Sequence, residues 1–188
     1  MWKIRKTYKY RLYPTKNQIV ILDEQLALCC ELYNAALQER RDAWKMAHKS
    51  IGFRSQSDQL PRIKADRPDV REIYSQVLQD VLHRVDKTFQ SFFRRVRHKE
   101  SPGFPRFRSY ARYDSLTYPQ LGFAIKDARL NLSKIGSIKI KLHRPVDGKI
   151  KTLTIKRAAG KWYACFSVEV VNIPLSPSSK SIGIDVGL

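Results

Sequence analysis

The spacing of hydrophobic residues changes twice along this chain of 188 residues. Apolar and cationic residues alternate over 3–13, which predicts a β-strand with one aromatic face and one cationic face. Pro14 ends this strand, and Thr15 is a residue type suited to cap a following helix. From residue 16 to about 46 the apolar positions recur at helical spacing, which predicts one long amphipathic helix.

Helical spacing continues after a break at 50–52. A short amphipathic segment is expected over 55–64, and a second long helix over about 71–98. The apolar stripe of this second helix runs from Ile73 to Val96. We expect these helices to pack as a small antiparallel bundle.

Short alternating segments follow a turn signal at Glu100–Gly103. They predict strands over 115–118, 122–125, 128–132, 137–142, 149–156 and 161–171. Such a series of strands with polar turns favours a small antiparallel barrel. We expect the strand at 3–13 to join the same sheet, because a lone strand does not persist.

The charge of the chain is strongly positive and unevenly distributed. Lys and Arg total 36 against 17 acidic residues, which gives a net charge of +19 and a pI near 10.1. The excess lies in 1–13, 84–112 and 126–161, whereas 14–83 is balanced. Basic surfaces bind nucleic acids through counterion release, so the blocks favour a polyanionic partner. Net charge alone would also suit a generic basic protein.

Membrane and metal-binding functions are not indicated. No apolar run approaches the ~20 residues of a membrane span, and the basic start lacks the apolar region of a signal peptide. We therefore expect a cytoplasmic protein without a membrane partner. The three cysteines, Cys29, Cys30 and Cys165, lack zinc-ligand spacing, and the adjacent pair is expected in the core.

The first strand carries the first candidate nucleic-acid-binding residues. Its cations are Lys3, Arg5, Lys9 and Arg11, and they alternate with Tyr8 and Tyr10. Cations that bind phosphates and rings that stack on bases occur together on sheets that hold nucleic acid. The alternative is a barrel strand whose tyrosines fill the core and whose lysines are solvated.

Two other segments carry candidate contacts. In 103–108, Pro105 favours an extended chain, Phe104 and Phe107 can anchor it, and the candidate phosphate-binding residues are Arg106 and Arg108. Near the start of the second long helix lies a polar patch made of Ser75, Gln76 and Gln79. Glutamine can form paired hydrogen bonds with adenine. Exposed helix faces are also commonly polar, so this patch is ambiguous on its own.

The last apolar segment, Ile182–Gly187, carries one carboxylate, Asp185. A carboxylate in a buried strand is costly unless it is paired or bound to a metal. One interpretation is the first strand of an RNase H-like nuclease, where such an aspartate helps hold two divalent metal ions. A second is the phosphate-binding turn of a sugar-kinase-like ATPase, although Leu188 stands where Thr or Ser usually follows. The third is a coincidental apolar strand.

Taken together, the motifs resemble the TnpB (OrfB-type) family of insertion-sequence proteins, which are RNA-guided DNA endonucleases related to type V CRISPR effectors. The resemblance covers the whole chain, and the motifs that carry it are Tyr10–Thr15, Tyr33-Asn34, Phe92–Arg94, Gly103–Arg108 and Gly183–Gly187. It implies an α+β fold: an antiparallel oligonucleotide-binding-like wedge barrel, interrupted by a helical recognition insert and followed by a RuvC, RNase H-like domain. The implied divisions are 1–14 and 101–172 for the barrel, 15–100 for the helices, 173–180 for a linker and 181–188 for the start of RuvC.

The resemblance also implies partners and site residues. Family members bind a guide RNA and a target DNA that carries a short transposon-adjacent motif, and the transposase of the same element is a further candidate partner. Residues expected near the DNA motif by matching positions are Phe53, Ser57, Ser75, Gln76, Gln79 and Tyr118. Phe53 stands where relatives can have tyrosine.

The same resemblance makes Asp185 the first RuvC carboxylate, a ligand of Mg²⁺ in a complete nuclease. The later acidic residues and the zinc-binding cysteines of the family are not found within these 188 residues. We therefore expect the 188-residue chain to bind nucleic acid without cleaving it and without a cofactor of its own. A nuclease-inactive DNA- or RNA-binding regulator, or a transposon remnant, is the alternative.

Overall fold

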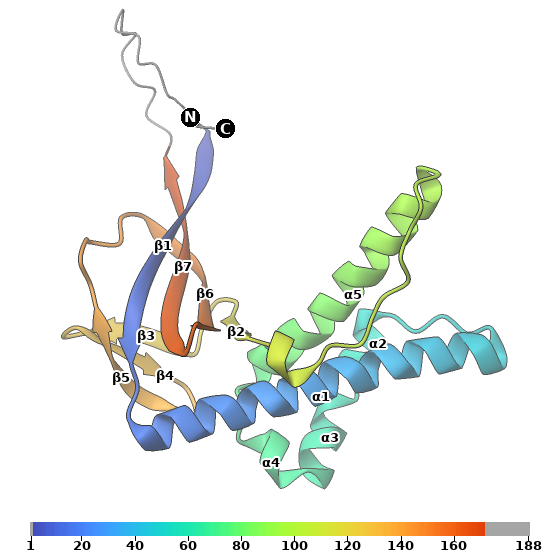
Figure 1. Cartoon of the computed structure of the whole chain (residues 1–188), viewed down its shortest axis with the longest axis horizontal. Helices are drawn as coiled ribbons and strands as arrows, with labels where there is room; N and C mark the ends of the chain where they lie inside the picture. Colours follow the sequence, from blue (N-terminus) through green and yellow to red (C-terminus); the bar gives the residue numbers. More distant parts are fainter. Residues whose placement is uncertain (1, 172–188) are drawn as a thin grey trace, which may run out of the picture.

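A computed structural model describes residues 2–171, which form a sheet on one side and a group of helices on the other (Figure 1). The elements in chain order are β1 (Lys3–Tyr13), α1 (Lys16–Ala47), α2 (Phe53–Ser57), α3 (Leu60–Asp66), α4 (Pro68–Arg71), α5 (Ser75–Arg97), the 3₁₀ turn η1 (Tyr110–Arg112), β2 (Ser115–Tyr118), β3 (Phe123–Lys126), β4 (Arg129–Leu132), β5 (Gly136–Lys141), β6 (Lys149–Ala158) and β7 (Lys161–Val171). The predicted strands are confirmed, and those at 3–13, 115–118 and 161–171 have the predicted bounds.

The strands form one antiparallel sheet of seven in the order β2-β6-β7-β1-β5-β4-β3. Strand β1 lies between β7 and β5, so the prediction that it joins the later strands is confirmed. The sheet curls toward closure. Phe123 of the edge strand β3 lies 6.3 Å, centre to centre, from Phe166 of β7. The hydroxyl of Tyr118, on the opposite edge strand β2, donates to the Ser133 carbonyl at 3.4 Å. The result is a nearly closed barrel.

Alternation along β1 sets which side chains face the barrel interior. Tyr8, Tyr10 and Leu12 are buried there, whereas the exposed Lys9 and half-buried Arg11 lie on the outer face. Strand β7 alternates in the same way, because the ladder pairs Tyr10 with Ala164 and Leu12 with Trp162. The aromatic face of the predicted strand is therefore the core face.

Helix α1 begins where the sequence predicts. The Thr15 hydroxyl accepts a hydrogen bond from the Gln18 backbone amide at 3.3 Å, and the Gln18 side chain accepts one from the Thr15 amide at 3.0 Å. This reciprocal pair is a capping box, which satisfies two amides that the helix itself cannot. The predicted cap is confirmed.

The second long helix begins later than predicted. The sequence favours a start near residue 71, but α4 ends there and α5 begins at Ser75. Ile73 is fully buried, and Lys64 donates to the Ile73 carbonyl at 3.0 Å. Tyr74 is extended and stacks on Tyr118 of the barrel at 5.8 Å. These tertiary contacts separate α4 from α5, and the helical pattern of the sequence does not reveal them.

Tyr74 also requires a glycine in the barrel. Gly122 has a positive φ of 87°, and a Cβ atom there would lie 2.5 Å from the Tyr74 ring. Any larger residue would displace this ring.

Arg84 joins α5 to the barrel. Its guanidinium donates to Asp80 at 2.7 Å, to the Ser115 carbonyl at 3.0 Å and to the Thr117 hydroxyl at 2.8 Å. It also lies 5.5 Å from the centre of the Tyr113 ring. Helix α5 is thereby held against β2.

Candidate nucleic-acid interface

Four strands of the barrel contribute to a cationic and aromatic row on its outer face. The register pairs Lys156 with Tyr163, Tyr163 with Arg11, and Arg11 with Lys141. We call these four residues the barrel row. The Tyr163 ring lies 4.2 Å from the Lys9 ammonium and 5.3 Å from the Arg11 guanidinium.

Three of the four cations in or beside the barrel row have no acidic partner among residues 2–171. Lys156 pairs with Asp114 at 3.4 Å, but among residues 2–171 no ion pair involves Lys9, Arg11 or Lys141. Arg11 and Lys141 are direct cross-strand neighbours, and like charges in that position destabilise a sheet. A polyanion on this face would offset that cost, because it would place phosphates between the cations.

Lys3 and Arg5 lie at the far end of β1, around a single carboxylate. Glu169 of β7 is 3.4 Å from the Lys3 ammonium and 3.3 Å from that of Lys151, and the ladder places it opposite Arg5. The hydrogen bond from Lys151, with Lys3 nearby, holds the pKa of Glu169 below its ordinary value. One carboxylate among three cations leaves this end positively charged.

Tyr8 and Tyr10 do not form a stacking surface for bases, so that prediction is wrong. Both are buried, with parallel rings 6.5 Å apart. The Tyr10 hydroxyl donates to the Arg144 carbonyl at 3.1 Å, and the Arg144 guanidinium lies 4.9 Å from the Tyr8 ring centre. The tyrosines instead hold the loop between β5 and β6.

Arg106 and Arg108 lie on an extended segment, residues 99–109, which we call the strap. It runs from the end of α5 back beside that helix and reaches α1 near η1 (Figure 1). Asn34 of α1 clamps it with two hydrogen bonds: the Arg108 amide donates to Asn34 Oδ1 at 2.9 Å, and Asn34 Nδ2 donates to the Arg108 carbonyl at 2.9 Å. The Arg108 guanidinium lies 5.2 Å from the Tyr33 ring, and Arg106 is exposed.

The two predicted anchors of the strap behave differently. Phe104 packs edge-on against Phe89 and Phe92 of α5, at centre distances of 6.0 and 5.4 Å. Phe107 makes no such ring contact with residues 2–171, although both rings are similarly exposed, at 49% for Phe104 and 47% for Phe107. The strap therefore presents Phe107 together with Arg106 on a backbone fixed at both ends.

The helix patch is partly engaged within the protein. Ser75 and Gln79 are exposed one turn apart on α5, and Ser75 accepts a hydrogen bond from Lys64 at 2.8 Å. Gln76 accepts one from the Leu121 backbone amide at 3.3 Å. Gln79 is therefore the member whose side chain has no hydrogen bond to residues 2–171.

Phe53 and Ser57 come from α2, which packs on α5. The Phe53 ring stacks on His83 at 3.7 Å with an interplanar angle of 12°. His83 lies one turn beyond Gln79, so the structure brings Phe53 close to the helix patch. Ser57 is half-buried.

Tyr118 is a correction to the predicted DNA-motif residues. Its side chain is fully buried in the barrel, between the Tyr74 ring and the Ser133 carbonyl that accepts its hydroxyl proton. Burial raises the pKa of this phenol well above its ordinary value. A side chain in this position cannot touch DNA directly.

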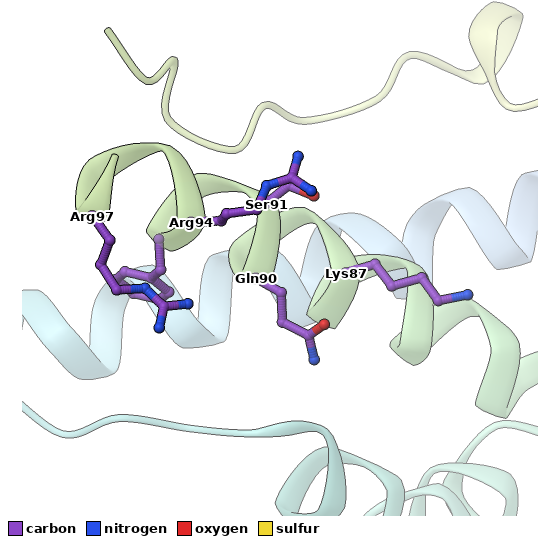
Figure 2. Close-up of a pocket in the computed structure, with 6 residues that line it drawn as sticks. Lys87, Gln90, Ser91, Arg94 and Arg97 are labelled. Carbon is purple, nitrogen blue, oxygen red and sulfur yellow. The ribbon is translucent and has the colours of Figure 1, made fainter. Parts of the chain in front are cut away.

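The C-terminal half of α5 carries a further cationic surface (Figure 2). A hollow of about 600 Å³ is lined by Lys87, Gln90, Ser91, Phe93, Arg94 and Arg97. In the described part of the chain, neither Lys87, Arg94 nor Arg97 forms an ion pair. This surface suits phosphates better than a small apolar ligand.

Asp185 lies outside the described residues. Within residues 2–171, no group of three or more His, Cys, Asp or Glu side chains could hold a metal ion. Over the same residues, no helix has the length and apolar content that crossing a membrane requires. Cys29 and Cys30 are buried, as predicted, and burial raises the pKa of the Cys29 thiol to about 12.

Sequence reasoning missed Lys141, Lys156 and Tyr163 as interface candidates. The available signal was the basic block at 126–161, which predicts charge but not which side chains share a face. Their alignment with Arg11 depends on the strand register.

Comparisons with known proteins agree with these observations. Residues 1–49 match a family model for OrfB proteins of IS605 type, described as a helix-turn-helix domain, although here they form β1 and one continuous helix. The RNA-guided DNA endonuclease InsQ of Escherichia coli (strain K12) is 26% identical over 97% of this chain and 45% of its own length. An RNA-guided DNA endonuclease of Streptomyces pristinaespiralis is 27% identical over 100% of this chain and 47% of its own length. The chain thus spans about half the length of these curated relatives.

One solved structure is also similar. A chain in a cryo-EM structure of a Cas12f1–sgRNA–target DNA complex aligns with a TM-score of 0.48 and 14% identity, over 91% of this chain and 49% of that chain.

Proposed function

Because the chain belongs to the TnpB (OrfB-type) family, we propose that residues 2–171 form the nucleic-acid-binding part of an RNA-guided DNA endonuclease. The barrel of β1 and β2–β7 would be the wedge, and the helices between β1 and β2 the recognition insert. The observation that carries the proposal is the barrel row, in which Arg11 and Lys141 face each other without an acidic partner among the described residues. The repulsion between Arg11 and Lys141 would be offset by a polyanion bound to this surface.

Two surfaces support two nucleic-acid partners. The barrel row and the strap carry cations and exposed rings, which suit the backbone and bases of a guide RNA. The helix patch offers Gln79, with Phe53 and His83 one turn away, which suits the edges of base pairs in a short DNA motif. Ser75 and Gln76 would support that patch through their contacts with Lys64 and Leu121.

Cleavage would depend on residues beyond this surface. We propose Asp185 as the first carboxylate of a RuvC-type site that binds Mg²⁺, the metal that activates the attacking water in such nucleases. A single carboxylate cannot hold two metal ions, so the 188-residue chain would bind nucleic acid without cutting it.

The binding proposal is tested by removing Lys9, which lies beside Tyr163 of the barrel row, and Arg106 of the strap. The double variant Lys9→Ala, Arg106→Ala should weaken binding of a fluorescein-labelled RNA to the 188-residue chain by about tenfold at 50 mM salt, because two phosphate contacts are lost. Fluorescence anisotropy measures the dissociation constant.

The matched control is Lys45→Ala, Arg62→Ala, which removes the same charge from the helical side, where Arg62 is exposed and pairs with Asp66. This control should change affinity less than twofold. Equal losses in the two double variants would show that only net charge matters, and would contradict a defined interface.

A further inference from the structure

Tyr13, the last residue of β1, is an exposed ring beside two lysines. Its side chain is 47% exposed on the outer face of the barrel. The register places it directly opposite Lys139 of β5. Together with Ile140 and Lys141, these residues line a hollow of about 290 Å³. Neither the helix patch nor the strap contributes to it.

The backbone that carries Tyr13 is fixed on both sides. Pro14 has a fixed φ and also restricts the backbone of the preceding Tyr13, and the capping box of Thr15 and Gln18 follows at once. The Gln18 side chain also donates to the Ser137 carbonyl of β5 at 3.0 Å, which ties the start of α1 to the strand that forms the other wall. The ring is therefore presented from a rigid corner, so little ordering is needed when a ligand binds.

Cations surround this ring. The Arg11 guanidinium lies 5.6 Å from the Tyr13 ring centre and 5.3 Å from that of Tyr163, so it bridges the hollow and the barrel row. Among residues 2–171, no ion pair involves Lys139 or Lys141. The site thus combines a flat aromatic face with positive charge on the opposite wall.

The size and chemistry of the hollow limit its ligand. Enclosed small-molecule pockets usually measure about 300–1,000 Å³, whereas this hollow is smaller and lies on the outer surface. One aromatic face can accept one base, and the lysines can contact its phosphates. In a duplex the base faces are already stacked on their neighbours, so a paired base cannot use the ring.

We propose that Tyr13, Lys139 and Lys141 form a subsite for one unpaired nucleotide, whose base stacks on the Tyr13 ring and whose flanking phosphates contact the two ammonium groups. The inference rests on the proposed function, because it assumes that nucleic acid follows the outer face of the barrel. It adds that one nucleotide of that strand is unstacked at this point.

The test compares single strands with duplexes. Fluorescein-labelled 12-nucleotide RNA and DNA of the same sequence, and the duplex of each, are titrated against the 188-residue chain and its Tyr13→Ala variant. Loss of a stacked base should weaken single-strand binding by about 5- to 100-fold, and duplex binding by less than twofold. Tyr13→Phe keeps the ring and should stay within twofold of the unchanged chain.

The control is Trp44→Ala, which removes another exposed ring, 58% exposed near the end of α1, and should leave all affinities within twofold. A greater loss for RNA than for DNA would identify RNA as the source of the nucleotide, and the reverse would identify DNA. Equal losses on single strands and duplexes, or no loss on any probe, would overturn the subsite.

Failure of the subsite can be distinguished from failure of the proposed function. If Lys9→Ala, Arg106→Ala weakens binding but Tyr13→Ala does not, the interface stands and the subsite is wrong. A second measurement does not depend on the folding of a variant. RNA carrying 5-iodouridine should crosslink under ultraviolet light to the peptide that contains Tyr13, and crosslinks confined to other peptides would contradict the assignment.

Discussion

A single arginine holds three helices together in the helical part of the molecule. Arg40 of α1 is 7% exposed, donates from Nε to Gln56 of α2 at 2.8 Å, and donates from Nη1 to Asp86 of α5 at 3.0 Å. Gln56 in turn donates to the Ala36 carbonyl at 2.8 Å. The Phe89 ring lies 5.3 Å from the Arg40 guanidinium. Arg40 therefore helps to fix the position of α2 and of its Phe53, together with the hydrogen bonds of Gln56 to Ala36 and Glu39 and the stacking of Phe53 on His83.

Removing this side chain should therefore be costly. Arg40→Ala leaves Gln56 and Asp86 without their partner, which should lower the free energy of unfolding by about 3 kcal/mol. Urea denaturation followed by circular dichroism measures this value. The neighbouring Arg41→Ala, at an exposed site, should stay within about 0.5 kcal/mol of the unchanged chain. A similar small loss for both variants would mean that α2 is held by other contacts.

At the scale of elements, local patterns predicted the strands better than the helix boundary. The bounds of β1, β2 and β7 follow from alternation that ends at Pro14 or at a turn, and these signals lie within each segment. The late start of α5 arises from the contact of Lys64 with the Ile73 carbonyl and the stacking of Tyr74 on Tyr118, and both partners lie outside the predicted helix. No periodicity within residues 71–98 contains that information.

In the interface, too, local sequence patterns predict some residues, whereas contacts between distant residues determine others. Lys9 and Arg11 could be chosen from the sequence, because alternation separates them from the tyrosines of the same strand. The sequence could not place Lys141 and Tyr163 beside Arg11, because the register joins residues about 130–150 positions apart. Tyr118 was misplaced because family position does not reveal that a side chain points inward.

The Asn34 amide makes most of the hydrogen bonds that hold the strap. Asn34→Ala removes two of the three side-chain hydrogen bonds to the Arg108 backbone and leaves the weaker one from the Cys30 thiol at 3.3 Å, so the strap should open locally more often. Limited digestion with trypsin should then cleave after Arg106 and Arg108 about tenfold faster, as followed by mass spectrometry. Asn17→Ala, at an exposed position in the first turn of α1, should leave these two rates unchanged. Unchanged cleavage in Asn34→Ala would show that Phe104 and the Cys30 thiol are enough to fix the strap.

At the scale of the whole molecule, the net charge of +19 predicts that binding to nucleic acid depends strongly on salt concentration. The proposed single-strand surface contains six cations, namely Lys9, Arg11, Arg106, Arg108, Lys139 and Lys141. Each phosphate contact contributes about −0.7 to the slope of log K against log salt for a single strand, so six contacts give about −4. Anisotropy titrations of the 12-nucleotide RNA between 50 and 300 mM KCl measure this slope. A slope weaker than about −1 would contradict binding across the whole surface.

The pairing of β1 with β7 also limits the order in which the parts of the molecule can fold during synthesis. The first strand and the last described strand pair along nearly their whole length, from Lys3 with Val171 to Leu12 with Trp162. A ribosome adds roughly 5–20 residues per second, so β1 leaves it about 8–30 s before its partner exists. The helices between them are complete well before that and pack through contacts closer in sequence. During synthesis the helical part can fold first, and the barrel closes last.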